Sequence, residues 1–147
     1  MNSVEEILDY AIAREQEAVD FYTDLAGRAK EWMRDFLMEF AREEARHKAK
    51  LVAVKDGEKL LSSKCKITDL KISDYLVEVE ATDDISVQDA MILAMQREKA
   101  AYRLYTDLAA RVDEAELREL FIGLAQEEAK HKLYFETKYD EEMLREN

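Results

Sequence analysis

Two glutamate–histidine pairs are the residues of this chain best suited to chemistry. The only two histidines each follow a glutamate by three residues, as Glu44-x-x-His47 and Glu128-x-x-His131. On an α-helix this spacing places carboxylate and imidazole on one face, one turn apart. Two such pairs, with one glutamate from each of two further helices, form the ligand set of a di-metal carboxylate site in a four-helix bundle. The rest of the sequence should therefore supply two more helices and two more glutamates.

Residues 3–55 are predicted to form a first helical hairpin. Ser3 and Glu6 have the spacing of a capping box, which predicts a helix start. The helix that follows should end near Gly27. Glu15 lies in the middle of its apolar face, which consists of Leu8, Ala11, Ile12, Ala18, Val19, Tyr22 and Ala26.

The second helix of this hairpin is expected to begin near Glu31 and to stop near Gly57. Glu44 and His47 lie at the centre of its apolar face, whereas Glu43 is displaced to the flank by roughly 80°, at ~100° per residue. The apolar positions of this face are Met33, Leu37, Phe40, Ala41, Leu51 and Val54.

Residues 86–147 are predicted to form a second hairpin. Ser86 begins a capping-box-like sequence, and Glu98 lies among apolar residues of the third helix, which are Met91, Ala94, Met95, Ala101, Tyr102, Tyr105 and Ala109. The acidic segment 113–116 is expected to cap the fourth helix, where the second Glu-x-x-His pair is surrounded by Leu117, Phe121, Leu124, Ala125 and Phe135. Residues 139–147 form an acidic tail that is expected to fray.

The two hairpins are an internal repeat. A shift of 83 residues superposes Glu15 on Glu98 and Tyr22 on Tyr105, and a shift of 84 residues superposes the two Glu-x-x-His pairs. The one-residue difference lies in the turn between the helices, where insertions are tolerated.

Residues 56–85 form the one long connection, with a short helix expected around residues 68–76. Such a crossover lets the third helix start at the correct end of a ferritin-like fold. The predicted fold class is therefore all-α: a ferritin-like four-helix bundle built from two repeated hairpins joined by a long crossover, in a single domain of residues 1–147.

The candidate ligands are predicted to lie at one level of this bundle. Glu15 lies about fourteen residues before the turn near Lys30 and Glu44 about fourteen after it, so at ~1.5 Å per residue each is roughly 20 Å from that turn. The second hairpin has the same arrangement around a turn near Asp113. The predicted metal ligands are Glu15, Glu44, His47, Glu98, Glu128 and His131.

Four carboxylates at one level of an apolar core require a compensating cation. Without one, their repulsion and desolvation would cost many kcal/mol. Two divalent ions bridged by carboxylates would supply the charge. Oxygen-rich ligation with one imidazole per metal suits two iron ions, or manganese or a mixed pair, better than structural zinc.

Two tyrosines accompany the predicted ligands. Tyr22 and Tyr105 follow Glu15 and Glu98 by seven residues on the same helix faces. They could donate hydrogen bonds to the ligand carboxylates, or they could be ordinary core tyrosines. The sequence favours neither alternative.

Composition restricts the partners. The net charge of −12, from 22 basic and 34 acidic residues, makes nucleic acid an unsuitable partner. No apolar run approaches membrane-spanning length, and the polar start of the chain is unlike a signal peptide. Cys65 is the only cysteine, so we expect an unremarkable free thiol in a reducing, cytoplasmic compartment.

With these motifs the chain resembles the rubrerythrin-type branch of the ferritin-like di-iron superfamily, over residues 3–140. The motifs that carry the resemblance are Arg14-Glu15-x-x-Ala18-x-x-Phe21-Tyr22, Glu44-x-x-His47, Arg97-Glu98-x-x-Ala101-Tyr102-x-x-Tyr105 and Glu128-x-x-His131. The resemblance implies that Glu44 and Glu128 bridge two irons, that Glu15 and Glu98 are terminal ligands, and that each iron takes one histidine.

Two departures from that family bear on activity. The single cysteine excludes the four-cysteine rubredoxin site that rubrerythrins carry. Rubrerythrins also place an extra carboxylate one turn after the third-helix ligand, where this chain has Ala101. In this respect the site resembles the ferroxidase centre of bacterioferritin.

Three functions remain open from the sequence. The favoured one is an oxidoreductase, in which a reduced di-iron site reacts with hydrogen peroxide or dioxygen and an external donor such as rubredoxin re-reduces it. The second is oxidation and handling of Fe²⁺, which for storage requires a hollow cage, and the third is a metal-stabilised scaffold without turnover. We expect a homodimer.

Overall fold

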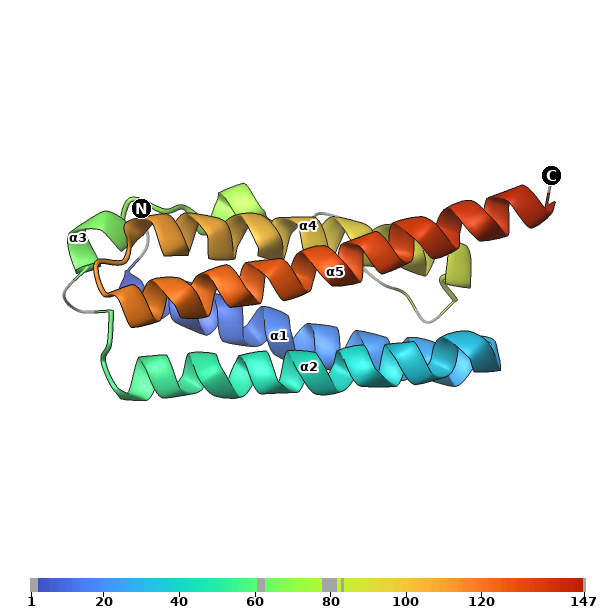
Figure 1. The fold of residues 1–147 in the computed structure, drawn as a ribbon, viewed down its shortest axis with the longest axis horizontal. Coiled ribbons are helices and arrows are strands. Elements are labelled where there is room, and N and C mark those ends of the chain that lie inside the picture. Colours follow the sequence, from blue (N-terminus) through green and yellow to red (C-terminus); the bar gives the residue numbers. More distant parts are fainter. Residues whose placement is uncertain (1–2, 61–62, 78–81, 83, 147) are drawn as a thin grey trace. The chain divides into compact units, whose positions relative to one another are not determined.

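The computed structural model describes residues 3–60, 63–77, 82 and 84–146. Within them, four long helices are α1 (Val4–Arg28), α2 (Glu31–Asp56), α4 (Val87–Arg111) and α5 (Ala115–Glu146), and the described residues contain no strand (Figure 1). The crossover adds the short helix α3 (Lys64–Ile67) and the 3₁₀ turn η2 (Ile72–Tyr75). The predicted all-α class is confirmed, and none of the described helices is long and apolar enough to cross a membrane.

The chain groups into two compact units. The first comprises Met1–Asp74 with Arg111–Glu114, and the second comprises Tyr75–Ala110 with Ala115–Asn147. Helices α1 and α2 therefore belong to the first unit, and α4 and α5 belong to the second. The last residue of α4 and the three-residue turn before α5 are grouped with the first unit.

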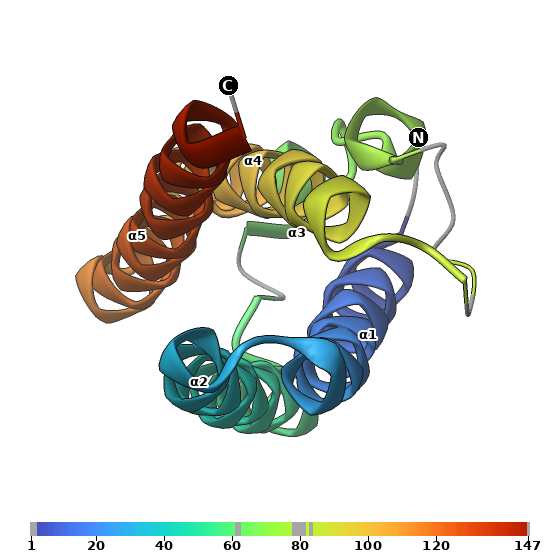
Figure 2. The same ribbon diagram turned by 90° about the vertical axis from the view of Figure 1, so that its right-hand side faces the viewer.

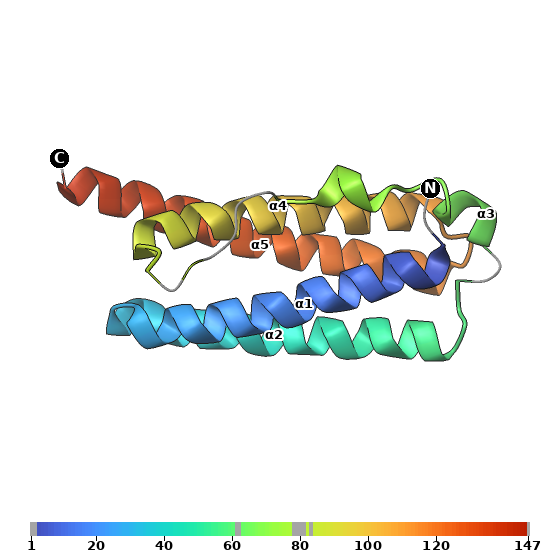
Figure 3. The same cartoon turned by 180° about the vertical axis from the view of Figure 1, so that it is seen from behind.

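The first hairpin has the helix cap and the short turn that the sequence predicts. Ser3 caps α1: its hydroxyl accepts from the Glu6 N–H at 3.1 Å, and the Glu6 carboxylate accepts from the Ser3 N–H at 3.4 Å. Helix α1 ends at Arg28, and α2 begins at Glu31 after a turn too short for anything but antiparallel packing. Figures 1 and 3 show the two helices side by side along their length.

Cross-helix pairs fix the register of this hairpin. In order along α1, the pairs are Asp9–Lys55, Glu15–His47, Gln16–Lys48 and Tyr22–Phe40. From Asp9 to Tyr22 along α1 the partner residue moves back from Lys55 to Phe40 along α2, as antiparallel packing demands. The apolar side chains between them are buried, including Ile7, Leu25, Leu37 and Leu51.

The second hairpin also has a helix cap and an antiparallel register. The Ser86 hydroxyl accepts from the Asp89 N–H at 3.0 Å, so α4 has the predicted cap. The rings of Tyr105 and Phe121 stack at 6.4 Å between centroids, and Glu98 lies opposite His131, which sets an antiparallel register of α4 against α5. Figure 2 looks along the helices and shows α1 beside α2, and α4 beside α5.

The crossover is attached to a helix turn at one point and to a helix at another. In the first unit, Lys66 pairs with Asp113 at 2.5 Å, and the Ser63 hydroxyl accepts from the Asp113 N–H at 3.1 Å. In the second unit, the Tyr75 hydroxyl donates to the Asp107 carboxylate at 2.5 Å, and the Arg103 guanidinium lies 5.8 Å from the centroid of the Tyr75 ring. These contacts give the crossover a defined course over its described parts.

Some local predictions need correction. The helix expected over residues 68–76 is replaced by α3, which is earlier, and by the 3₁₀ turn η2. The tail over residues 139–146, expected to fray, continues α5, because charged pairs such as Lys138 with Glu141 support another turn. Tyr102, assigned to an apolar face, is 42% exposed. The side chain of Cys65 and all of Asn147 lie outside the described residues.

Helix α2 ends in a Schellman motif with a glutamate at the left-handed position. The Lys59 N–H donates to the Val54 carbonyl at 3.1 Å and the Glu58 N–H donates to the Lys55 carbonyl at 3.0 Å. Glu58 has φ of 52°, whereas the glycine that predicted the helix end, Gly57, has φ of −82°. The glycine thus precedes by one residue the position where its conformational freedom would help most.

Replacing Glu58 by glycine should therefore stabilise the protein. Because the left-handed conformation is unfavourable for a residue with a Cβ, Glu58→Gly should raise the free energy of unfolding by about 0.5–1 kcal/mol, after the extra entropy of glycine in the unfolded chain is subtracted. The measurement is chemical denaturation of metal-free protein. Glu58→Gln is the control, because it removes the charge and keeps the Cβ. An equal gain from both variants would show that charge, not backbone strain, is responsible.

Candidate metal centre

The buried polar side chains of this protein are almost the same set as the predicted ligands. Among the described residues, seven polar or charged side chains are buried: Glu15, Glu44, His47, Ser63, Glu98, Glu128 and His131. Ser63 is explained by its hydrogen bond from Asp113. The other six are 1–2% exposed, which is rare for glutamates unless a partner compensates for their charge.

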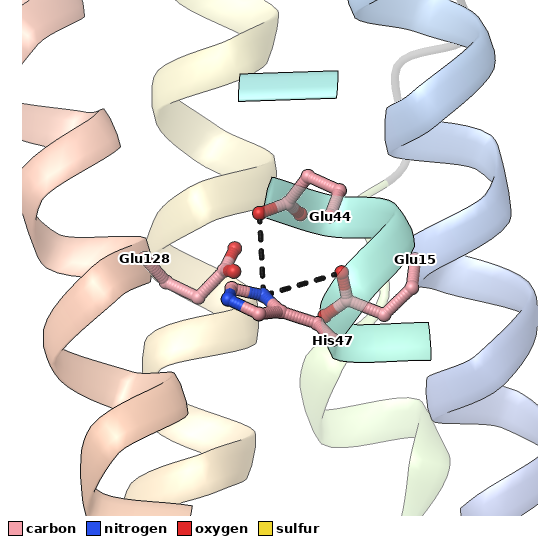
Figure 4. A group of neighbouring side chains, drawn as sticks. All are labelled: Glu15, Glu44, His47 and Glu128. Carbon is pink, nitrogen blue, oxygen red and sulfur yellow. Dashed lines mark ion pairs between the residues drawn. The ribbon is translucent and has the colours of Figure 1, made fainter. Parts of the chain in front are cut away.

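The first unit brings three of them together as a half-site. Figure 4 shows Glu15 from α1 and Glu44 from α2 pointing toward the imidazole of His47. His47 Nδ1 lies 3.6 Å from Glu15 Oε2 and 3.4 Å from Glu44 Oε1. One ligand atom from each residue lies within 4.8 Å of the other two. Glu15 and Glu44 therefore lie at the same level of this hairpin.

The second unit brings the repeat-related three together. His131 Nδ1 lies 3.6 Å from Glu98 Oε1, and Glu98, Glu128 and His131 each offer a ligand atom within 4.8 Å of the others. Glu98 comes from α4 and the Glu-x-x-His pair from α5. Each unit therefore contains two buried carboxylates and one buried imidazole in the same arrangement.

The spacing within a half-site suits a shared ion. A direct N–H···O hydrogen bond spans ~2.7–3.2 Å, so contacts of 3.4 and 3.6 Å are long for one. Two atoms each ~2.1 Å from one metal ion, at an angle of ~110–120°, would be ~3.4–3.6 Å apart. The donor set of carboxylate oxygens and one imidazole nitrogen is also one that divalent transition metals accept.

The charge of each half-site also favours a bound metal ion. Two ionised glutamates and a neutral imidazole carry a formal charge of −2, and no lysine or arginine among the described residues is buried. A protonated histidine would compensate only one of the two charges. A divalent cation compensates both, and each half-site can therefore hold a metal.

The glutamates that precede Glu44 and Glu128 in the sequence lie on the flanks of their helices, as helical geometry predicts. Glu43 and Glu127, next to the ligand glutamates in sequence, are half-buried on the helix flanks, not in the half-sites. Tyr22 and Tyr105 are both fully buried and make ring contacts, Tyr22 edge-on to Phe40 and Tyr105 stacked on Phe121. A hydrogen bond from either hydroxyl to a ligand carboxylate stays a prediction.

A third tyrosine lies one turn beyond a predicted ligand. Tyr134 follows His131 by three residues on α5 and is half-buried. Burial, and secondarily the charge of Glu141, raise the pKa of Tyr134 to about 12. The phenol of Tyr134 is therefore protonated at neutral pH.

The sequence did not reveal one polar contact beside the first half-site. Lys48 Nζ, from the residue after His47, donates to Gln16 Oε1, from the residue after Glu15, at 2.8 Å. The only signal that could have found it is the register: if Glu15 faces His47, the residues that follow them lie on one flank.

Comparison with known proteins gives one match. The family model described as Rubrerythrin matches residues 6–139. No curated protein and no solved structure shows significant similarity to the chain. The match covers all six predicted ligands, from Glu15 to His131, so it confirms the resemblance inferred from the motifs and, with the four long helices, the predicted four-helix-bundle class.

Substitution of neighbouring glutamates should separate ligands from flank residues. Glu44→Gln should abolish metal binding at one position or both, because it removes a buried charge that faces His47. Glu43→Gln is the matched control and should leave the metal content unchanged. Elemental analysis of both variants after dialysis against Mn²⁺ or Fe²⁺ is the measurement. Equal losses from the two variants would show that the assigned helix face is wrong by one residue.

Removal of metal should destabilise the protein strongly. Without a cation, the four buried carboxylates must be protonated or hydrated, so chelation should lower the melting temperature markedly, and re-addition of Fe²⁺ or Mn²⁺ should restore it. Differential scanning calorimetry with and without a chelator gives the comparison. An unchanged melting temperature in protein shown to lose its metal would contradict the assignment.

Proposed function

Because the chain belongs to the rubrerythrin family, we propose that it is a di-iron carboxylate oxidoreductase, which reduces hydrogen peroxide or dioxygen with electrons from an external donor. The family is one whose members bind iron. The observation that carries the proposal is the pair of buried half-sites, each with two carboxylates and one imidazole whose ligand atoms converge.

We assign the six ligands by chemistry and repeat symmetry. Glu15 with His47 would hold one iron and Glu98 with His131 the other, while Glu44 and Glu128 would bridge the two. A half-site alone offers three protein ligands, which is few for an ion that accepts six. Two bridging carboxylates would raise the number to four per ion and leave positions for the substrate. The matched depths of Glu15, Glu44, Glu98 and Glu128 in the sequence support one shared centre.

The chain's own residues would supply charge balance, orientation and exclusion of water. The four carboxylates balance four positive charges of two ferrous ions, and the helices hold them at 1–2% exposure. Two ferrous ions supply two electrons together, which matches the conversion of H₂O₂, two protons and two electrons into two water molecules. The single cysteine cannot form an electron-transfer cluster in this chain, so the two electrons must return from a separate donor such as rubredoxin.

Iron handling is the second candidate, and Ala101 is the observation that favours it. Ala101 is half-buried one turn after Glu98, where rubrerythrins carry an additional carboxylate. Without that group the ligand set is closer to a ferroxidase centre, so Fe²⁺ oxidation by dioxygen is the natural competing reaction. A manganese or mixed-metal centre would fit the same ligands. A homodimer and a cytoplasmic location complete the proposal.

The diferrous protein should be oxidised rapidly by one equivalent of hydrogen peroxide per chain. Continued turnover should require an added reductant such as a rubredoxin system, because the chain stores no further electrons. Stopped-flow absorbance of the diferrous protein, mixed separately with peroxide and with air-saturated buffer, measures both reactions. The zinc-loaded protein is the control, because zinc cannot change its oxidation state.

Each alternative function predicts a different result. No oxidation by peroxide would contradict the peroxidase proposal. Fast oxidation by dioxygen with many irons accumulated per chain would indicate ferroxidase and storage activity. Stable metal binding without any redox reaction would leave the scaffold function.

A further inference from the structure

The two half-sites share a ligand pattern but differ on their flanks. In the first hairpin, Lys48 Nζ donates to Gln16 Oε1 at 2.8 Å, and Gln16 Nε2 donates to Asp20 Oδ1 at 2.9 Å. Both ends of the Gln16 amide are thus held in place. Lys48 and Gln16 are half-buried and directly follow the candidate ligands His47 and Glu15. We call the contact of Lys48 with Gln16 the brace.

A second contact continues the same flank. Lys55 Nζ lies 2.6 Å from Asp9 Oδ1, seven residues beyond the brace on each helix, which is two turns. The bond to Asp9 raises the pKa of Lys55, although this pair is solvent-exposed. Two polar links between α1 and α2 therefore lie along one flank of the first hairpin, and the nearer one adjoins the half-site.

Neither link has its residue pair in the second hairpin. The repeat places Lys99 at the position of Gln16 and keeps a lysine, Lys132, at the position of Lys48. Because Glu98 faces His131, the residues that follow them put two ammonium groups on one flank. Lys132 forms an ion pair with Glu136 on its own helix instead of bridging to α4.

The charge next to each half-site differs as a result. Beside the first, Lys48, Gln16 and Asp20 sum to zero. Beside the second, the equivalent residues are Lys132, Lys99 and Arg103, all of them cationic; Lys132 pairs with Glu136, and Lys99 and Arg103 are exposed. Cations near a site disfavour binding of a further cation, and a braced pair of helices loses less freedom when it binds.

From these differences we infer that the half-site of the first hairpin binds metal first and more tightly, and that Gln16 and Lys48 are positioning residues for it. The inference rests on the proposed di-metal function. It adds an order of loading that the symmetric ligand pattern by itself does not contain. The microscopic affinities should differ by about tenfold or more, the usual scale for groups that orient metal ligands.

The two histidines allow a direct test, because the chain has one in each half-site and no others. Metal-free protein is titrated with Zn²⁺, a diamagnetic probe, and the two imidazole Cε1–H signals are followed by NMR. His47→Gln assigns them. The metal-free His47 signal should disappear over the first equivalent of Zn²⁺, and the His131 signal over the second. Parallel loss of the two signals, or earlier loss of His131, would overturn the inference.

A reciprocal exchange of flank residues tests the cause. Gln16→Lys with Lys99→Gln moves the neutral residue to the second hairpin, and it should close the affinity gap or reverse the order of loading. Lys50→Gln, at an exposed position of α2, is the control for a change of charge without loss of the brace. Lys55→Gln removes only the distant link. If Lys55→Gln changed the order as much as the exchange did, general hairpin rigidity would replace the brace as the cause.

The outcome separates this inference from the proposed function. Binding of fewer than two Zn²⁺ per chain would contradict the di-metal centre itself. Binding of two without a preferred order would contradict only the inequality of the half-sites. The wild-type titration gives both the number of ions bound and the presence of an order, and His47→Gln serves only to assign the two signals.

Discussion

The burial of four carboxylates is the constraint on which the rest of this structure depends. Glu15, Glu44, Glu98 and Glu128 are 1–2% exposed inside helices whose other inward positions are apolar. Ionised groups in such surroundings are costly unless a cation accompanies them, and no described lysine or arginine is buried with them. In the metal-free state this arrangement carries a large electrostatic cost, which bound divalent ions would remove.

The hairpins convert a local spacing into a three-dimensional ligand set. A Glu-x-x-His pair needs only one helical turn, but the third ligand of each half-site comes from the other helix and depends on register. That register is fixed by contacts well away from the ligands, such as the Tyr22–Phe40 and Asp9–Lys55 pairs. The register of each hairpin is therefore set by its packing as a whole, and the brace between Gln16 and Lys48 acts on the first half-site within that register.

Much of this could be predicted from the sequence, because helix faces and repeats are local and periodic. The six candidate ligands, the cap at Ser3 and the turn near Lys30 follow from spacing alone. The brace between Gln16 and Lys48, the left-handed Glu58 and the Tyr75–Asp107 hydrogen bond could not be predicted. They depend on which of several polar neighbours a long side chain reaches and on where a helix unwinds. Neither property follows from a periodic sequence pattern. The identical segments Thr23–Ala26 and Thr106–Ala109 show this: Asp107 accepts from Tyr75, whereas Asp24 lies 3.8 Å from Arg28 on its own helix.

We propose that the six candidate ligands hold two irons in one dinuclear centre. X-ray absorption at the iron edge, on anaerobically reconstituted protein with two Fe²⁺ per chain, tests it most directly. A dinuclear centre should give scattering from a second iron at about 3.5–4 Å, together with oxygen and nitrogen ligands including one imidazole per iron. Two equivalents of bound iron without any iron–iron scattering would show two separate mononuclear sites and would rule out a dinuclear centre.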